Sequence, residues 1–311
     1  MKNYALAIHG GAGTILKNTM TPEKELLYKN GLQHAIDAAE NILKSGGTAF
    51  DAVEKAIIEL ENNPLFNAGK GAVFTNKGTH ELDASIMNGS NLMAGAVAGV
   101  HNVKNPIALA RGVMEQSEHV LLTGVGAMDF AKKINSPLEN DDYFFVQLRH
   151  DQLQQALQSN TMVLDHTDNK SNEKKFGTVG CVALDLQGNL AAGTSTGGMT
   201  NKKYGRVGDS AIIGAGTYAN NKTCAISCTG HGELFMRSVV AYDISCLMEY
   251  KNLTLKEACQ IVVMEKLVKI GGEGGLIALD SNGNIELPFN SDGMYRASKK
   301  QNEEIYIGIY K

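Results

Sequence analysis

The sequence lacks long apolar runs and lacks an excess of positive charge. No segment reaches the roughly 18 consecutive apolar residues of a membrane-spanning helix, and the apolar run near the amino terminus is too short for a signal peptide. The net charge is −4 with both signs interspersed, which leaves no basic face for nucleic acid and no polybasic membrane anchor. We therefore expect a cytoplasmic protein with small-molecule or peptide partners, and with neither nucleic acid nor a membrane as a partner.

The sequence also lacks cysteine pairs with metal-site spacing and a hinge between domains. Its five cysteines are scattered through apolar segments, without the CxxC spacing of a zinc site, and we interpret them as small core side chains. No proline- or serine-rich stretch divides two self-sufficient halves. With 311 residues, of which 43% are apolar, the chain can bury a large core, so we predict a single domain over residues 1–311.

What the sequence does contain is an alternation of strand hairpins and helix pairs. Apolar periodicity and capping residues predict helices over 22–45, from 48, from 106, over 232–250 and over 254–270. Strand patterns between turn formers predict strands over 4–9, 72–75, 81–87, 94–100, 178–185, 189–195, 211–213, 223–228, 275–280, 285–288 and 304–310. Hairpins flanked by helix pairs favour an α+β fold with two sheets between helical layers.

The dipeptide Gly177-Thr178 is the most informative place in the chain. Residues 168–175, which carry no apolar side chain, lead up to it, and a buried strand follows it. If the bond between the two residues were cut, Thr178 would carry a free α-amine beside its hydroxyl, so nucleophile and base would share one residue. An α-amine has an unperturbed pKa of about 7.7–8.0, close to working pH. The arrangement is typical of an N-terminal-nucleophile hydrolase, although Gly-Thr alone is a common dipeptide.

Two later turns are rich in glycine and hydroxyl groups. Thr196 lies at the end of the neighbouring strand, where its hydroxyl can hold the nucleophile in one rotamer. Thr229 and Gly230 lie between a strand and a helix amino terminus, where a hydroxyl and backbone N–H groups can cradle an oxyanion. Each segment also fits a simple turn between two elements, and both interpretations stay open at this point.

Arg206 and Asp209 place opposite charges three residues apart in a loop punctuated by glycine. An arginine fork can hold a carboxylate through two parallel hydrogen bonds, and an aspartate can accept from an ammonium group. The pair is therefore a candidate grip for the head group of an α-amino acid. The alternative is a surface ion pair between the two residues, worth at most about 1 kcal/mol.

Several ordered segments carry a family resemblance. They are His9-Gly10-Gly11-Ala12-Gly13, Asn63-Pro64-Leu65-Phe66-Asn67-Ala68-Gly69, Glu81-Leu82-Asp83-Ala84, Gly177-Thr178-Val179-Gly180, Thr194-Ser195-Thr196-Gly197-Gly198, Gly205-Arg206-Val207-Gly208-Asp209-Ser210 and Thr229-Gly230-His231-Gly232-Glu233. In this order they resemble the plant-type L-asparaginase and isoaspartyl peptidase family of threonine hydrolases. The likeness extends to Pro288-Phe289-Asn290-Ser291 and so covers nearly the whole chain.

The resemblance implies a four-layer αββα sandwich of the N-terminal-nucleophile hydrolase type. It implies autocleavage into an α subunit, residues 1–177 with a flexible linker at about 164–177, and a β subunit, residues 178–311. Two such heterodimers are expected to assemble. The implied activity is hydrolysis of β-aspartyl dipeptides and L-asparagine to L-aspartate through a threonine acyl-enzyme, with no organic cofactor.

Catalytic roles are carried over by motif. The resemblance implies that the chain is cut between Gly177 and Thr178 and that Thr178 is the nucleophile. Thr196 would orient the nucleophile. Thr229 and the Gly230 amide would form the oxyanion hole.

Binding roles are carried over in the same way. Arg206 would hold the substrate α-carboxylate and Asp209 its α-ammonium, while Gly232 would line the pocket together with Thr229 and Gly230. The family also binds a structural sodium ion through main-chain oxygens of one loop. The ligands expected here are Leu60, Glu61, Asn63, Phe66, Ala68 and Lys70.

Other interpretations remain open within and outside this fold. A glycosylasparaginase-like amidase or a threonine endopeptidase would share the fold, and a catalytically silent relative would act as a binding protein and stay uncut. His9 and His231 lie beside glycine turns, but no Ser-His-Asp order accompanies them, so we interpret both as structural. The glycines at 10–13 match neither a P-loop nor the full GxGxxG pattern. Met87, Met93 and Met114 are expected in the core.

Overall fold

The computed structural model describes residues 3–158 and 177–311. The first range forms the strands β1 (Ala5–Gly13), β2 (Leu82–Asn88), β3 (Ala94–Val100) and β4 (Leu121–Thr123). Its helices are α1 (Pro22–Lys44), α2 (Ala49–Glu61), α3 (Pro106–Gln116), α4 (Gly124–Lys133), α5 (Asp141–Phe144) and α6 (Gln147–Gln158). Thr21 and Thr48 cap α1 and α2, since each hydroxyl accepts the N–H three residues further on.

The second range forms the strands β5 (Val179–Leu184), β6 (Leu190–Thr196), β7 (Thr217–Ala219), β8 (Cys224–Gly230), β9 (Gly274–Asp280), β10 (Ile285–Glu286), β11 (Gly293–Lys300) and β12 (Tyr306–Tyr310). Its helices are α7 (Gly232–Ser238), α8 (Val240–Lys251), α9 (Leu255–Cys259) and α10 (Leu267–Lys269), with a π-helical turn over Gln260–Lys266. The linker expected at about 164–177 lies outside the described residues except for Gly177.

Some predicted elements are wrong. Residues 72–75 form no strand, since Thr75 makes only an isolated bridge, and Ala211 ends a 3-10 turn instead of starting a strand. The helix expected over 232–250 breaks at Val239, whose φ of 48° lies in the left-handed region. We missed β11 because its charged residues hide the strand pattern; the strand pairs with both β1 and β12.

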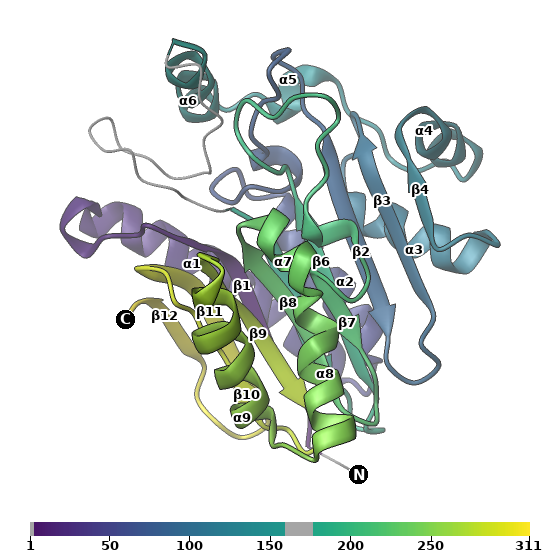
Figure 1. The fold of residues 1–311 in the computed structure, drawn as a ribbon. Coiled ribbons are helices and arrows are strands. Elements are labelled where there is room, and N and C mark those ends of the chain that lie inside the picture. Colours follow the sequence, from purple (N-terminus) through teal and green to yellow (C-terminus); the bar gives the residue numbers. More distant parts are fainter. Residues whose placement is uncertain (1–2, 159–176) are drawn as a thin grey trace.

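These strands make two sheets. The larger has the order β12-β11-β1-β5-β6-β2-β3-β4 and the smaller has the order β10-β9-β8-β7. The described neighbours pair antiparallel, apart from β3 with β4. In Figure 1, α8 and α9 lie in front of the smaller sheet and α1 lies behind the larger one. The protein is a mixed α and β structure with two sheets and helices packed against them.

The apolar side chains sort into two cores, one on each face of the larger sheet. Along β1, Leu6 and Ile8 belong to the core that includes α1, α2 and α3. Ala5 and Ala7 belong to the core that includes the smaller sheet, α8 and α9. The two-residue period of a strand produces this division.

The remaining side-chain expectations have a mixed outcome. All five cysteines are unpaired, and all are buried except Cys246, which is half-buried. Met87 and Met114 are buried as expected, but Met93 is exposed because it lies in the turn between β2 and β3. Within 3–158 and 177–311, no helix combines the length and the apolar character needed to cross a membrane.

Candidate active site

Antiparallel pairing brings the predicted nucleophile beside its predicted partner. Thr178 immediately precedes β5, and Thr196 is the last residue of β6, which pairs with β5. Because antiparallel neighbours run in opposite directions, the start of one strand meets the end of the other. The hydroxyl oxygens of Thr178 and Thr196 lie 3.1 Å apart, and both side chains are buried.

The carbonyl of Gly177 lies against both hydroxyl groups. In the uncut chain its oxygen is 2.8 Å from Thr178 Oγ1 and 2.9 Å from Thr196 Oγ1. The side-chain amide of Asn67 donates a further hydrogen bond to the same oxygen over 2.9 Å. The bond that we predict to be cut therefore has the Thr178 hydroxyl beside it and hydrogen-bond donors on its oxygen.

Sequence reasoning did not give Asn67 a role, although the residue belongs to one of the quoted segments. Its side chain is fully buried and hydrogen-bonded at both ends. The Nδ2 group donates to the carbonyls of Gly177 and Gly198, and Oδ1 accepts from the N–H of Val73. These bonds fix the orientation of the amide. An asparagine in a turn-rich loop carries no local signal of this task, because its target is 110 residues away in the sequence.

The smaller sheet supplies Thr229 and Gly230 at the end of β8. The Thr229 side chain is fully buried, and its Oγ1 accepts from the N–H of Ala12 over 3.1 Å. A hydroxyl that accepts from a backbone N–H keeps its own proton available for donation. The geometry therefore leaves Thr229 free to donate toward a negative charge.

Arg206 is held by a carboxylate that sequence reasoning overlooked. Its Nε and Nη2 atoms donate to the two carboxylate oxygens of Glu233 over 2.8 and 2.9 Å. The described ion pairs thus join Arg206 to Glu233 and not to Asp209. Burial alone would raise the pKa of Glu233, but the hydrogen bonds from Arg206 outweigh it and hold that pKa below its ordinary value.

Asp209 is buried, and its Oδ2 atom has no hydrogen-bond partner among the described residues. Burial raises the pKa of Asp209 to about 7, against the opposing effect of the nearby Arg206 charge. Gly232 permits this close arrangement. A Cβ atom there would lie 2.8 Å from Arg206 Nη2 and 2.9 Å from Asp209 Oδ1.

One small pocket is lined by most of the predicted cleavage, catalytic and substrate-binding residues. It has a volume of about 20 Å³ and is lined by Gly177, Thr178, Thr196, Gly198, Met199, Arg206, Gly208, Asp209, Ser210 and Gly230. Thr229 precedes the lining residue Gly230 on β8, and Gly232, two residues after Gly230, begins α7. Nucleophile, oxyanion donors and both head-group candidates therefore share one location.

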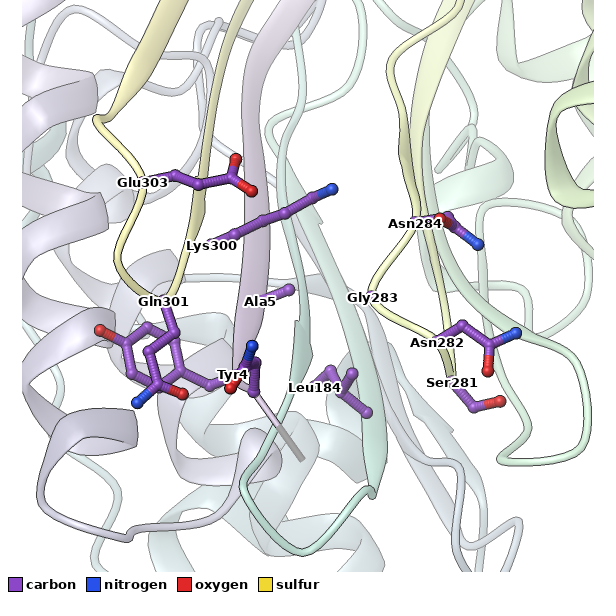
Figure 2. A pocket seen from close by; sticks show the side chains of 11 residues that line it. Tyr4, Ala5, Leu184, Ser281, Asn282, Gly283, Asn284, Lys300, Gln301 and Glu303 are labelled. Carbon is purple, nitrogen blue, oxygen red and sulfur yellow. The ribbon is translucent and has the colours of Figure 1, made fainter. Parts of the chain in front are cut away.

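A larger cavity, of about 340 Å³, lies at the end of β1 and β5 that is far from Thr178 (Figure 2). Ala5 and Leu184, which are opposite each other in the sheet, contribute to it together with Asn282, Lys300 and Glu303. It contains none of the predicted site residues.

The loop predicted to hold sodium packs backbone against backbone. Gly69 has a φ of +51°, and a Cβ there would lie 2.6 Å from the main-chain oxygen of Glu61. A Cβ at Gly71 would lie 2.1 Å from the main-chain oxygen of Phe66. The Glu61 carboxyl is already engaged by Ser195 and the N–H of Ile107, and burial raises its pKa to about 8 against these hydrogen bonds. Because the Glu61 carboxyl is engaged, the main-chain oxygen is the group that Glu61 can offer to a cation.

His9 contacts the site without offering a base. His9 Nδ1 is 3.1 Å from the Thr178 carbonyl oxygen, and burial lowers the pKa of His9 to about 3, against the effect of that hydrogen bond. His231 lies 3.5 Å from Glu233. Neither histidine is hydrogen-bonded to a Thr178 hydroxyl in the described contacts.

Comparisons with known proteins agree with the family resemblance seen in the sequence. A family model described as asparaginase matches residues 2–309. The chain is 52% identical to the isoaspartyl peptidase of Escherichia coli (strain K12), over all of this chain and 97% of that protein. It is 40% identical to a probable isoaspartyl peptidase/L-asparaginase 2 of Arabidopsis thaliana over the full length of both, and 40% identical to an isoaspartyl peptidase/L-asparaginase of Mus musculus over 99% of this chain and 91% of that one. The chain belongs to the asparaginase family that this model describes.

Proposed function

We propose that this chain hydrolyses β-aspartyl dipeptides and L-asparagine to L-aspartate through Thr178, after it cuts itself between Gly177 and Thr178. The names of its relatives support this substrate class. One observation carries the mechanism: the Thr178 hydroxyl lies 2.8 Å from the Gly177 carbonyl oxygen, which also accepts from Asn67 and Thr196.

This geometry supports autocleavage. Thr178 Oγ1 attacks the Gly177 carbonyl carbon, and hydrogen bonds from Asn67 and Thr196 stabilise the charge that develops on the oxygen. The C–N bond then breaks, the nitrogen takes up the proton that the Thr178 hydroxyl gave up, and Gly177 is left as an ester on the Thr178 oxygen. Water hydrolyses the ester, which frees the Gly177 carboxylate and leaves Thr178 with its hydroxyl and an α-amine.

The mature site then acts on substrate. The α-amine of Thr178 removes the proton from its own hydroxyl, which attacks the side-chain carbonyl of the aspartyl group. Thr229 Oγ1 and the Gly230 amide stabilise the oxyanion. Ammonia or an amino acid leaves, and water releases aspartate from the acyl-enzyme.

Substrate binding uses groups that the folded chain leaves available. Glu233 occupies the Nε and Nη2 side of Arg206, and an arginine has five N–H donors, so others remain for an α-carboxylate. The unpartnered Oδ2 of Asp209 can accept from an α-ammonium. Both grips act on the aspartyl half that the two substrates share.

The larger assembly and the ion are parts of the same proposal. We place a structural sodium ion among main-chain oxygens of Leu60, Glu61, Asn63, Phe66, Ala68 and Lys70, and two of these oxygens, of Glu61 and Phe66, lie close to Gly69 and Gly71. The ion would steady the loop that carries Asn67. We also propose a four-layer αββα sandwich and a dimer of αβ heterodimers.

The test combines intact mass with product analysis. Wild type, Thr178→Ala and the remote control Thr254→Ala are incubated, then offered β-aspartyl-leucine and asparagine. We expect wild type and the control to split between Gly177 and Thr178 and to release aspartate, while Thr178→Ala stays whole and loses at least about 1000-fold in activity. A folded wild-type chain that stays uncut and inactive would instead indicate a binding protein.

A further inference from the structure

A chain of buried polar side chains runs between the two sheets behind the nucleophile. Its members are His9, Ser85, Thr194, Thr217 and Ser227, and each is 0% exposed. We call this set the intersheet polar row. Buried polar groups are costly unless they are hydrogen-bonded, and the core around them is apolar. The burial of five polar side chains in this core therefore needs a structural or functional explanation.

Strand register creates the row. In the larger sheet, His9 is opposite Gly180, Gly180 is opposite Thr194, and Thr194 is opposite Ser85. Residues directly opposite each other share one face of a sheet. The row thus crosses four adjacent strands on the face that meets the smaller sheet.

The smaller sheet contributes the other two residues of the row, Thr217 and Ser227, which are opposite each other on β7 and β8. Ser227 Oγ lies 2.9 Å from His9 Nε2 and 2.6 Å from Thr194 Oγ1. Gly180 makes room for these contacts: a Cβ there would lie 1.9 Å from Ser227 Oγ and 2.5 Å from His9 Nε2. This explains physically why glycine ends the Gly177-Thr178-Val179-Gly180 segment.

The Thr178 carbonyl, at one end of the row, fixes which group donates in each of the following hydrogen bonds. The Thr178 carbonyl can only accept, so His9 Nδ1 carries the proton and Nε2 accepts from Ser227. Ser227 has then used its proton, so Thr194 donates to Ser227, and Thr217 donates to Thr194. The neutral ring is thereby held in a single tautomer and orientation.

The row touches each part of the site. It ends on the main chain of Thr178 at His9, and Ser227 lies two residues before Thr229 on β8. At the far end, Ser85 donates to the carbonyl of Ser210, the neighbour of Asp209. The row therefore extends from the Thr178 main chain, past the strand that carries Thr229, to the residue next to Asp209.

We propose that His9 is a positioning residue for the mature nucleophile. This inference rests on the proposed function of Thr178. Once the Gly177-Thr178 bond is cut, Thr178 becomes a chain end, and chain ends fray unless they are held. The β5 ladder begins only at Val179, so the hydrogen bond from His9 to the Thr178 carbonyl holds the new end in line with Thr229.

Two amide variants separate the bonds of His9. An asparagine side chain places its N–H₂ where His9 has Nδ1, and a glutamine places its polar end near Nε2. We expect His9→Asn to keep kcat within about three-fold of wild type, because it retains the donor to Thr178. We expect His9→Gln to lower kcat per cleaved chain by about ten-fold or more, with KM little changed, because it loses that donor. Ser227→Ala should lower kcat less, because His9 Nδ1 keeps its hydrogen bond to Thr178.

Ser245→Ala is the matched control. Ser245 and Thr223 form another fully or nearly buried hydroxyl pair, 2.7 Å apart, at the other end of β8. Each variant is checked by intact mass for cleaved chain and by melting temperature. The control should lose melting temperature as Ser227→Ala does, but keep kcat.

Three results would overturn the proposal: kcat in His9→Gln equal to that in the control, equal losses in folded His9→Asn and His9→Gln, or a change in KM alone. If His9→Gln folds but stays uncut, this result supports the proposal only when His9→Asn is cut. An inactive wild type would contradict the proposed function and this inference with it, whereas an active wild type with equal kcat in His9→Gln and the control would overturn this inference alone, so the two failures are distinguishable.

Discussion

The two ends of β1 and β5 differ in a way that volume alone would misjudge. At the Ala5 and Leu184 end lies a cavity of about 340 Å³ with polar groups around an open space (Figure 2). At the Thr178 end lies a pocket of only about 20 Å³. There the buried side chains of Asn67, Thr178 and Thr196 are all hydrogen-bonded to the Gly177 carbonyl oxygen. Chemistry is indicated by convergence of buried polar groups, and not by empty space.

The largest effect expected at the Thr178 end, beyond loss of the nucleophile, comes from Asn67→Ala. This change removes one donor from the Gly177 oxygen, and loss of one oxyanion donor typically costs about 100- to 1000-fold in rate. We expect self-cleavage to slow by that amount, as followed by intact mass over time. Asn282→Ala, at the cavity end, is the control. Equal cleavage rates in Asn67→Ala and wild type would remove Asn67 from the mechanism.

Asp209→Asn should come next, through substrate binding. Losing the carboxylate that faces the α-ammonium should raise KM about 100-fold. In the ligand-free protein the pKa of Asp209 is about 7, so its carboxylate is charged above that pH. The affinity of the wild type for substrate should therefore rise as pH increases through 7. Measuring KM between pH 5.5 and 8.5 checks this. If the variant kept the same pH dependence, another group would be responsible.

The same substitution should stabilise the ligand-free protein at high pH. Asp209 has a folded-state pKa raised from 3.8 to about 7, so the folded chain holds its proton more tightly than the unfolded chain. The associated stability is present below pH 3.8 and is lost as pH rises through 7. Asp209→Asn should therefore be more stable than wild type at pH 8, by on the order of 1–4 kcal/mol, and similar at pH 4. Chemical denaturation at both pH values measures this, and a variant equally or less stable at pH 8 would contradict it.

The smallest effect is expected at the cavity end. Lys300→Ala and Asn282→Ala change the lining of the larger cavity, far along the strands from Thr178. Both should leave cleavage and kcat/KM within about two-fold of wild type, as is usual for surface substitutions. A large loss in either variant would break the contrast between the two ends.

Local physics made much of the molecule predictable. Thr21 and Thr48 cap the helices expected after them, because capping involves residues only three positions apart. The strands expected over 4–9 and 94–100 are also present, as β1 and β3. Segment resemblance also pointed to Thr178, Thr196, Arg206, Asp209 and Thr229, which the folded chain brings to one place. The helix break at Val239 and the strand β11 were not predicted, because a left-handed residue and a strand with charged side chains depend on their neighbours in space.

By itself, the sequence determined the helices with clear caps, the division of the apolar faces and the family to which the chain belongs. Only the tertiary structure decided that Asn67 meets Gly177, that Glu233 and not Asp209 holds Arg206, and that His9 supports the Thr178 main chain. The reason is physical. Propensity and periodicity act within a few residues, whereas a hydrogen bond between residues 110 or 169 positions apart exists only once strand register has brought its two atoms together.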